Sequence, residues 1–118
     1  MSSGNSRFFV YKKLTKEQVG EFHEKGYLFL GRTLTEEGLE KIREQVLAAW
    51  RAEKGKFDPN KTWLQNALIP DIHHRALLVR DYYFSGPLVD ISEQLIGPNI
   101  KAATSQLTFK MRGNTQTF

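Results

Sequence analysis

The residues best suited to bind a metal ion are three histidines, His23, His73 and His74. A mononuclear non-haem iron site uses two histidines and one carboxylate, and it leaves coordination positions open for oxygen and a co-substrate. The chain has no His-x-Asp or His-x-Glu, and Asp71 and His73 stand in the reverse order. Together with His74 and the distant His23 they could gather a metal only if rigid elements held them. We expect instead that His23 lies on a helix surface and that His73 and His74 begin a helix.

A second candidate is a small anion site near Gly113, where Lys110 and Arg112 flank Met111. Side chains alternate along a strand, which puts Lys110 on the same face as Gln106 and Met111 on the opposite face. If the polar face lines a cavity, Gln106 and Lys110 meet a small polar ligand. The alternative is a solvent-exposed strand edge, where charged strand residues usually lie.

Motifs of other common catalytic sites are absent from the sequence. There is no cysteine, which excludes disulfides and thiolate metal sites. Neither a Gly-x-Ser-x-Gly turn nor a glycine-rich phosphate loop occurs. The paired carboxylates Glu36 and Glu37 fall at a predicted helix start, where the helix dipole accounts for them. The individual motifs therefore name no reaction.

Composition predicts a single soluble globular domain. The chain has 118 residues, of which 40% are hydrophobic and 25% charged, and a mean hydropathy of −0.47; these values exclude disordered, collagen-like and membrane-spanning chains. The formal net charge is +4, with acid-free segments at 1–16 and 101–118. Because nucleic-acid binders gather basic residues on one face or helix, we expect no nucleic-acid partner. We also expect no membrane association and an intracellular location, since no apolar secretory segment opens the chain.

Helix signals organise the first half of the chain. A capping box beginning at Thr15 starts a short helix that Gly26 ends. The apolar run 27–30 then predicts a short strand buried on both faces. Thr35 opens a longer helix with apolar residues at steps of three and four, which Gly55 closes. Residues 1–13 are expected to be a flexible lead-in to one domain spanning 14–118.

Beyond residue 55 the pattern changes twice. Residues 56–72 show no sustained period and predict a long, ordered, irregular connection. Residues 73–84 predict a helix, and Pro87 starts another that runs to Ile96.

After a Gly-Pro-Asn turn, residues 101–112 alternate and predict a long strand. Its apolar face carries Leu107, Phe109 and Met111. Because two strands alone make a marginal sheet, this strand needs partners that the chain does not obviously contain.

The order of these motifs resembles the N-terminal half of the phytanoyl-CoA dioxygenase family. A helix ending in Gly-Tyr, a short strand and a Leu-Thr-Glu-Glu helix start follow one another in LTKEQVGEFHEKGYLFLGRTLTEEGLEKIREQV. A Gly-Pro-Asn turn and a strand ending in Lys-x-x-Gly, here Lys110 to Gly113, follow in LIGPNIKAATSQLTFKMRGNTQTF. The resemblance covers Leu14 to Phe118.

Members of this family are iron(II)- and 2-oxoglutarate-dependent oxygenases built on a double-stranded β-helix. The resemblance therefore implies an α+β fold, in which an N-terminal helical wrap precedes the first strands of a jelly-roll or cupin-like β-helix that is incomplete in this chain. It implies hydroxylation of a small organic substrate with Fe(II) and 2-oxoglutarate as cofactors.

The resemblance also implies roles for particular residues. Gln106, with Lys110, would lie near 2-oxoglutarate. The entrance for substrate or co-substrate would be shaped by Trp63, Leu64, Gln65 and Leu68. The family's His-x-Asp motif, second histidine and 2-oxoglutarate-binding arginine would follow Phe118, so the 118 residues alone are expected to lack the metal triad and to be inactive.

Two other functions remain open. A stand-alone, non-catalytic domain could keep the helical wrap and pair its exposed strand, residues 101–111, with another copy or another protein. A small basic module could instead bind nucleic acid, with an affinity that depends strongly on salt. The separation of the two basic segments in the sequence makes this function less favoured.

Overall fold

The protein is an α+β domain in which helices carry a two-stranded antiparallel sheet. The computed structural model describes residues 7–53 and 58–109. The elements are α1 (Lys16–Lys25), α2 (Glu36–Glu53), α3 (Trp63–Ala67), β1 (Leu68–Pro70), the 3-10 helix η1 (Ile72–His74), α4 (Leu77–Ser85), α5 (Pro87–Ile96) and β2 (Gln106–Thr108).

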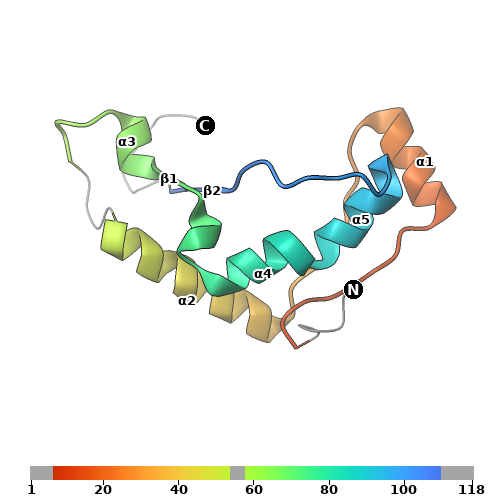
Figure 1. Ribbon diagram of the computed structural model, residues 1–118, viewed down its shortest axis with the longest axis horizontal. Coiled ribbons are helices and arrows are strands. Elements are labelled where there is room, and N and C mark those ends of the chain that lie inside the picture. Colours follow the sequence, from red (N-terminus) through yellow and green to blue (C-terminus); the bar gives the residue numbers. More distant parts are fainter. Residues whose placement is uncertain (1–6, 54–57, 110–118) are drawn as a thin grey trace.

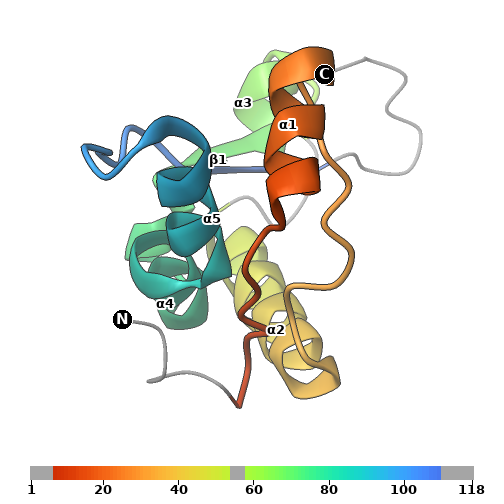
Figure 2. The same cartoon turned by 90° about the vertical axis from the view of Figure 1, so that its right-hand side faces the viewer.

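The helices form an elongated support for the sheet. Figure 1 shows α4 and α5 following one another across the molecule, with α2 packed along α4 and α1 beside α5. The same neighbours lie together in Figure 2. The segment after α5 runs back along α5 and α4 to reach β2, which pairs with β1 (Figure 1). The sheet therefore lies at the end of the molecule where α2, α3 and η1 meet.

The two predicted helix starts of the first half and the helix stop at Gly26 are confirmed. The Thr15 hydroxyl accepts a hydrogen bond from Gln18 N, the Gln18 side chain accepts one from Thr15 N, and Gly26 ends α1 with φ of 85°. The Thr35 hydroxyl accepts from Gly38 N at 3.0 Å at the start of α2. Gly55 lies outside the described residues.

The predicted strand at residues 27–30 is wrong. This segment has no regular secondary structure, and Tyr27 and Phe29 are 55% and 87% exposed. The Lys12 ammonium donates to Leu30 O at 2.6 Å, but no strand lies beside residues 27–30 among the residues that the structure describes. An apolar run becomes a buried strand only where another strand and a packing layer are present. The chain pairs slightly later, in an isolated antiparallel bridge between Phe9 and Leu34.

From Arg7 onward, the expected lead-in is held against the helices. Phe9 is 2% exposed and its ring contacts Tyr82 edge-on, with centroids 5.4 Å apart. Backbone bonds join Val10 N to Thr33 O and Thr35 N to Phe8 O, each at 2.9 Å. Residues 7–14 thus form part of the folded domain.

An ion pair at the beginning of this segment makes stability depend on pH. The Arg7 guanidinium donates to the Glu37 carboxylate at 2.7 Å, which lowers the pKa of Glu37 and raises that of Arg7. A lowered carboxyl pKa stabilises the fold above the ordinary glutamate pKa, and this stabilisation is lost as the pH falls through the folded-state value. We therefore expect Glu37→Gln to lower the melting temperature at pH 7, and we expect this effect to become smaller as the pH falls below the ordinary glutamate pKa. Glu40→Gln, on the same helix, is the control, and an equal effect of both variants at pH 7 would contradict the assignment.

The described part of the predicted connection, residues 58–72, is more regular than predicted. Thr62 and Gln65 form a second capping box, with Gln65 N donating to Thr62 Oγ1 at 3.2 Å and Thr62 N donating to Gln65 Oε1 at 3.0 Å. It starts the short helix α3, and β1 follows directly. The prediction of an irregular connection was wrong because α3 and β1 are both too short to show a period, although the Thr-x-x-Gln signal is present in the sequence.

Replacing Thr62 with Ala is expected to destabilise the domain by about 1 kcal/mol, the usual contribution of an N-cap hydroxyl. Thermal unfolding followed by far-UV circular dichroism measures the change. Thr62→Ser keeps the hydroxyl and should behave as the wild type; a loss with Ser as large as that with Ala would rule out the capping role.

The helix predicted at residues 73–84 is divided in two. Asp71 adopts a left-handed conformation with φ of 53°, η1 follows, and α4 begins at Leu77. The side chain of Gln45 on α2 accepts a hydrogen bond from Leu78 N at 2.8 Å, so a contact from another helix fixes the start of α4. The helix that starts at Pro87 is confirmed, with Ile96 as its last residue.

Candidate functional site

Gln106 lies on β2, whose register is fixed by antiparallel pairing with β1. The paired residues are Leu68 with Thr108, Ile69 with Leu107 and Pro70 with Gln106. Asp71 N donates to Ser105 O at 2.8 Å, next to the pair of Pro70 and Gln106. Gln106 and Thr108 are exposed, whereas Leu107 between them is half-buried. The alternation predicted for this part of the strand is present.

The helices cover the apolar face of β2. Leu107 packs against a buried cluster formed by Ala49 of α2, Ile69 of β1 and Ile72 of η1. Phe109 stacks on Trp50 of α2, with ring centroids 4.7 Å apart and planes 20° apart. α2 therefore supplies a packing layer for Leu107 and Phe109. The helices thus lie on one side of β2, and Gln106 lies on the other.

The strand is much shorter than the predicted range 101–112. Residues 101–104 are exposed and not in a strand, and Ala103 does not share the buried face of Leu107. The physical reason is that β1 has only three residues, so β2 can form a ladder only opposite them. Lys110, Met111, Arg112 and Gly113 lie outside the described residues, and with them the Lys-x-x-Gly motif.

A polar clamp fixes the chain immediately before Gln106. The Ser105 hydroxyl accepts a hydrogen bond from His73 N at 3.2 Å and lies 2.5 Å from His73 Nδ1. The Tyr83 hydroxyl donates to Thr104 O at 2.7 Å. Sequence reasoning missed Ser105 and Tyr83, because the partners in these bonds are 32 and 21 residues apart. The clamp holds the backbone that positions the Gln106 side chain.

The predicted entrance residues lie on α3 and β1. Leu64 is 46% exposed, and Leu68 is half-buried at the start of β1. The Gln65 side chain is engaged in the capping box of α3. Trp63 is the first residue of α3. Of the four, Leu68 is in direct register with the strand that carries Gln106, opposite Thr108.

The buried polar residue of this region is Asn66, which was not predicted. It is 3% exposed, its Oδ1 accepts from Asp58 N at 2.7 Å, and its Nδ2 donates to Asp58 O and Thr62 O, each at 3.0 Å. These bonds tie the segment before α3 to the helix. The polar groups most deeply buried here therefore hold the backbone.

His23 lies exposed on the surface of α1 as expected, whereas His73 and His74 end the 3-10 helix η1 and do not begin a helix, because α4 starts only at Leu77. The His73 ring packs against Tyr83 and Phe84, with centroids 5.1 and 5.6 Å away. Within residues 7–53 and 58–109, no three side chains of His, Cys, Asp or Glu come together as a metal site would require.

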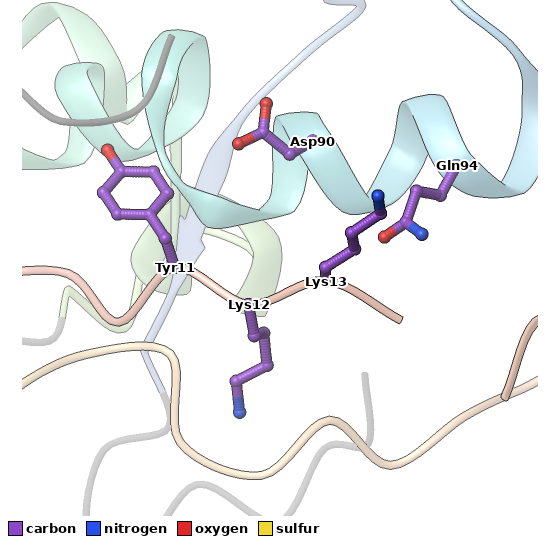
Figure 3. A pocket seen from close by; sticks show the side chains of 5 residues that line it. All are labelled: Tyr11, Lys12, Lys13, Asp90 and Gln94. Carbon is purple, nitrogen blue, oxygen red and sulfur yellow. The ribbon is translucent and has the colours of Figure 1, made fainter. Parts of the chain in front are cut away.

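A shallow pocket lies where the N-terminal segment runs beside α5 (Figure 3). It measures about 380 Å³ and is lined by Tyr11, Lys12, Lys13, Asp90 and Gln94. The Gln94 amide accepts from Leu14 N at 2.8 Å and donates to Leu14 O at 3.1 Å. Figure 3 shows the Lys12 side chain directed away from α5 and the Lys13 side chain directed toward it. The side chains of Gln94 and Lys12 therefore hold neighbouring backbone segments in place through hydrogen bonds.

Tyr11 in this pocket is also held by the fold. Its hydroxyl donates to Ser85 O at 2.8 Å. Burial raises the pKa of Tyr11, and the nearby carboxylates of Asp90 and Asp81 raise it further. Tyr11 therefore stays protonated at neutral pH and acts as a donor, not as a base.

The chemistry open to Gln106 is recognition of a small polar ligand. Its amide offers two N–H donors and one carbonyl acceptor, and the side chain is exposed on the face of β2 away from the helices. A ligand carboxylate suits the two donors. The described residues bring no iron-binding set of donors to this face.

Comparison of the chain with family models, with curated proteins and with solved structures finds no match. None of the helices within residues 7–53 and 58–109 is long and apolar enough to cross a membrane.

Proposed function

We propose that this chain belongs to an iron(II)- and 2-oxoglutarate-dependent oxygenase of the phytanoyl-CoA dioxygenase type and provides its N-terminal helical wrap and an early strand of its β-helix. The observation that carries the proposal is the arrangement around β2. Leu107 packs on the helices, while Gln106 is exposed on the other face. In a β-helix or jelly roll, strands cover a cavity with one face and meet the outer layers with the other.

The order of elements supports the same proposal. α1 ends at a left-handed Gly26 before Tyr27, and α2 begins directly after Thr35. The Gly97-Pro98-Asn99 turn follows α5 and leads toward β2. These are the motifs on which the resemblance rests, in the same order. Segment 27–30, where the resemblance implies a short strand, does not form one.

In the proposed enzyme, the Gln106 amide donates hydrogen bonds to a carboxylate of 2-oxoglutarate. The resemblance also implies a role near 2-oxoglutarate for Lys110, which lies outside the described residues. Leu64 and Leu68 would form part of an apolar entrance for a small organic substrate. Bound Fe(II), with O2 and 2-oxoglutarate, supplies the oxidant for hydroxylation. The described residues do not include a set of ligands for it.

The deciding experiment uses the protein isolated from its natural source. Its intact mass is measured first, followed by formation of succinate from 2-oxoglutarate in the presence of Fe(II). We expect turnover, and we expect Gln106→Ala to raise the KM for 2-oxoglutarate by about tenfold or more, since a hydrogen bond to a charged group contributes about 1.5–3 kcal/mol.

Two controls separate binding from folding. Thr108→Ala removes a side chain from the same face of β2 and should leave the KM for 2-oxoglutarate unchanged. Both variants should unfold at the wild-type temperature. A natural protein of 13.6 kDa that neither binds nor consumes 2-oxoglutarate would overturn the proposal.

A second candidate is a non-catalytic domain that pairs β2 with another chain. It is favoured by the small size of the sheet, since β2 has β1 as its single partner strand in the described part of the chain and edge strands accept further strands. The purified 118-residue chain would then form dimers in light scattering. A synthetic peptide of residues 101–111 should compete with dimerisation, and a monomer at all concentrations would exclude self-pairing.

A further inference from the structure

An apolar groove lies between the α4–α5 pair and the segment that follows α5. It has a volume of about 480 Å³, within the usual range of small-molecule sites. Phe84, Leu88 and Ile96 line it from the helices, and Ile100 and Lys101 line it from the segment after α5. Gln106 is not among its lining residues, so the groove is separate from the face of β2 discussed above.

The apolar side chains of the groove are unusually open to solvent. Phe84 is 52% exposed, Leu88 37% and Ile96 71%. On α5, the buried residues are Pro87 and Ile91, so other side chains of this helix anchor it to the fold. Several large apolar side chains gathered in one exposed groove indicate a site for a ligand or a partner.

The charge of the groove narrows the choice of ligand. Lys101 is the single charged residue among those that line it, and it forms no ion pair with any residue that the structure describes. A second copy of the chain docked on a twofold axis would bring a second Lys101 to this groove without an acidic residue to neutralise either. A ligand with an apolar body and one negative charge would cover the exposed apolar side chains of the groove and would pair with Lys101.

We propose that the groove binds a small apolar carboxylate, with its hydrocarbon part along Phe84, Leu88 and Ile96 and its carboxylate beside the Lys101 ammonium. From Leu88 to Ile96 an α-helix rises about 12 Å, which suits a medium-length alkyl chain. The proposal does not depend on the oxygenase function. Loss of 2-oxoglutarate turnover would leave it intact, and loss of carboxylate binding would leave the oxygenase proposal intact.

The test uses decanoate as the probe and the purified 118-residue protein. Binding is measured by isothermal titration calorimetry, with decyl alcohol and decylamine for comparison. We expect saturable one-to-one binding of decanoate that is tighter than binding of the alcohol, and no detectable binding of the amine. Lys101→Glu should lower the affinity for decanoate by about three- to tenfold, in line with the modest strength of exposed ion pairs. The same variant should bind decylamine more tightly than decanoate.

A matched pair of variants tests the location. Ile96→Asp places a charge in the groove. It should lower the affinity for decanoate by more than about tenfold, because the apolar contact that Ile96 makes with the bound alkyl chain is lost. Leu77→Asp is the control, since Leu77 is 69% exposed and does not line the groove. We expect both variants to give the circular dichroism spectrum of the wild type, because neither substitutes a buried residue.

Three outcomes would overturn the proposal. The first is the absence of saturable decanoate binding. The second is equal binding of decanoate and decyl alcohol that Lys101→Glu does not change. The third is a stable dimer in light scattering that Ile96→Asp dissociates and Leu77→Asp does not, which would assign the groove to a second copy.

Discussion

Leu107→Lys is expected to unfold the domain or to leave it close to unfolding, whereas Gln106→Lys is expected to change the free energy of unfolding by less than about 0.5 kcal/mol. The two positions are neighbours on β2 and receive the same side chain. Leu107 packs on the cluster of Ala49, Ile69 and Ile72. A lysine at this position must either place its ammonium among apolar side chains or force β2 to separate from the helices. Gln106 points away from the helices and is exposed.

The expected loss for Leu107→Lys is about 3 kcal/mol or more, from lost apolar contact and an unpaired charge. Small domains have total stabilities of about 5–15 kcal/mol, so a loss of this size is visible in urea unfolding followed by circular dichroism. If both variants lose the same stability, the helices do not cover one face of β2 in preference to the other. The proposal for Gln106 would then lose its structural support.

The parts of the fold that the sequence predicts are those set by local contacts. The capping box at Thr15, the glycine at position 26, the hydroxyl of Thr35 and the proline at position 87 each act within a few residues, and all four mark element ends in the structure. Such signals work without knowledge of the neighbouring helices.

Other parts depend on partners distant in the sequence. The apolar segment 27–30 is not a strand, because no neighbouring strand pairs with it in the described part of the chain. β2 is limited to three residues by the length of β1, and the start of α4 depends on Gln45 of α2. Hydrophobic periodicity reports which residues prefer burial, but it does not report which element is available to bury them.

In the candidate site, too, some features follow from local sequence and others depend on contacts between distant residues. Alternation alone places Gln106 and Leu107 on opposite faces, and the structure has them so. The clamp of His73 and Tyr83 on residues 104–105 depends on contacts across the fold, and no short motif announces it. The groove beside Lys101 likewise requires α4, α5 and the following segment to come together.

Gly38→Ala is expected to destabilise the domain by about 2–4 kcal/mol, even though alanine is the better helix former. Gly38 lies in the first turn of α2, where the backbone of the N-terminal segment crosses it. A Cβ atom at this position would lie 2.0 Å from Phe8 O and 2.9 Å from the Phe8 carbonyl carbon. The segment must therefore move away, which breaks the bond from Thr35 N to Phe8 O and draws the buried Phe9 from its contact with Tyr82.

Gly20→Ala provides the matched control. Gly20 is an exposed residue inside α1, and a Cβ there meets nothing within 4 Å, so this substitution should stabilise the domain by about 0.5–1 kcal/mol. Chemical denaturation of both variants tests the opposite signs. A stabilising Gly38→Ala would show that residues 7–10 do not rest on α2.

Deletion of residues 1–8 identifies the cause of the loss. Without Phe8 there is no carbonyl for the new methyl group to meet, so Gly38→Ala in the shortened chain should be neutral or stabilising by up to about 1 kcal/mol. The interaction between the two changes is the double-mutant-cycle difference. This difference should be nearly as large as the loss of stability that Gly38→Ala causes in the full chain, since that loss arises from one backbone contact and not from the helix itself.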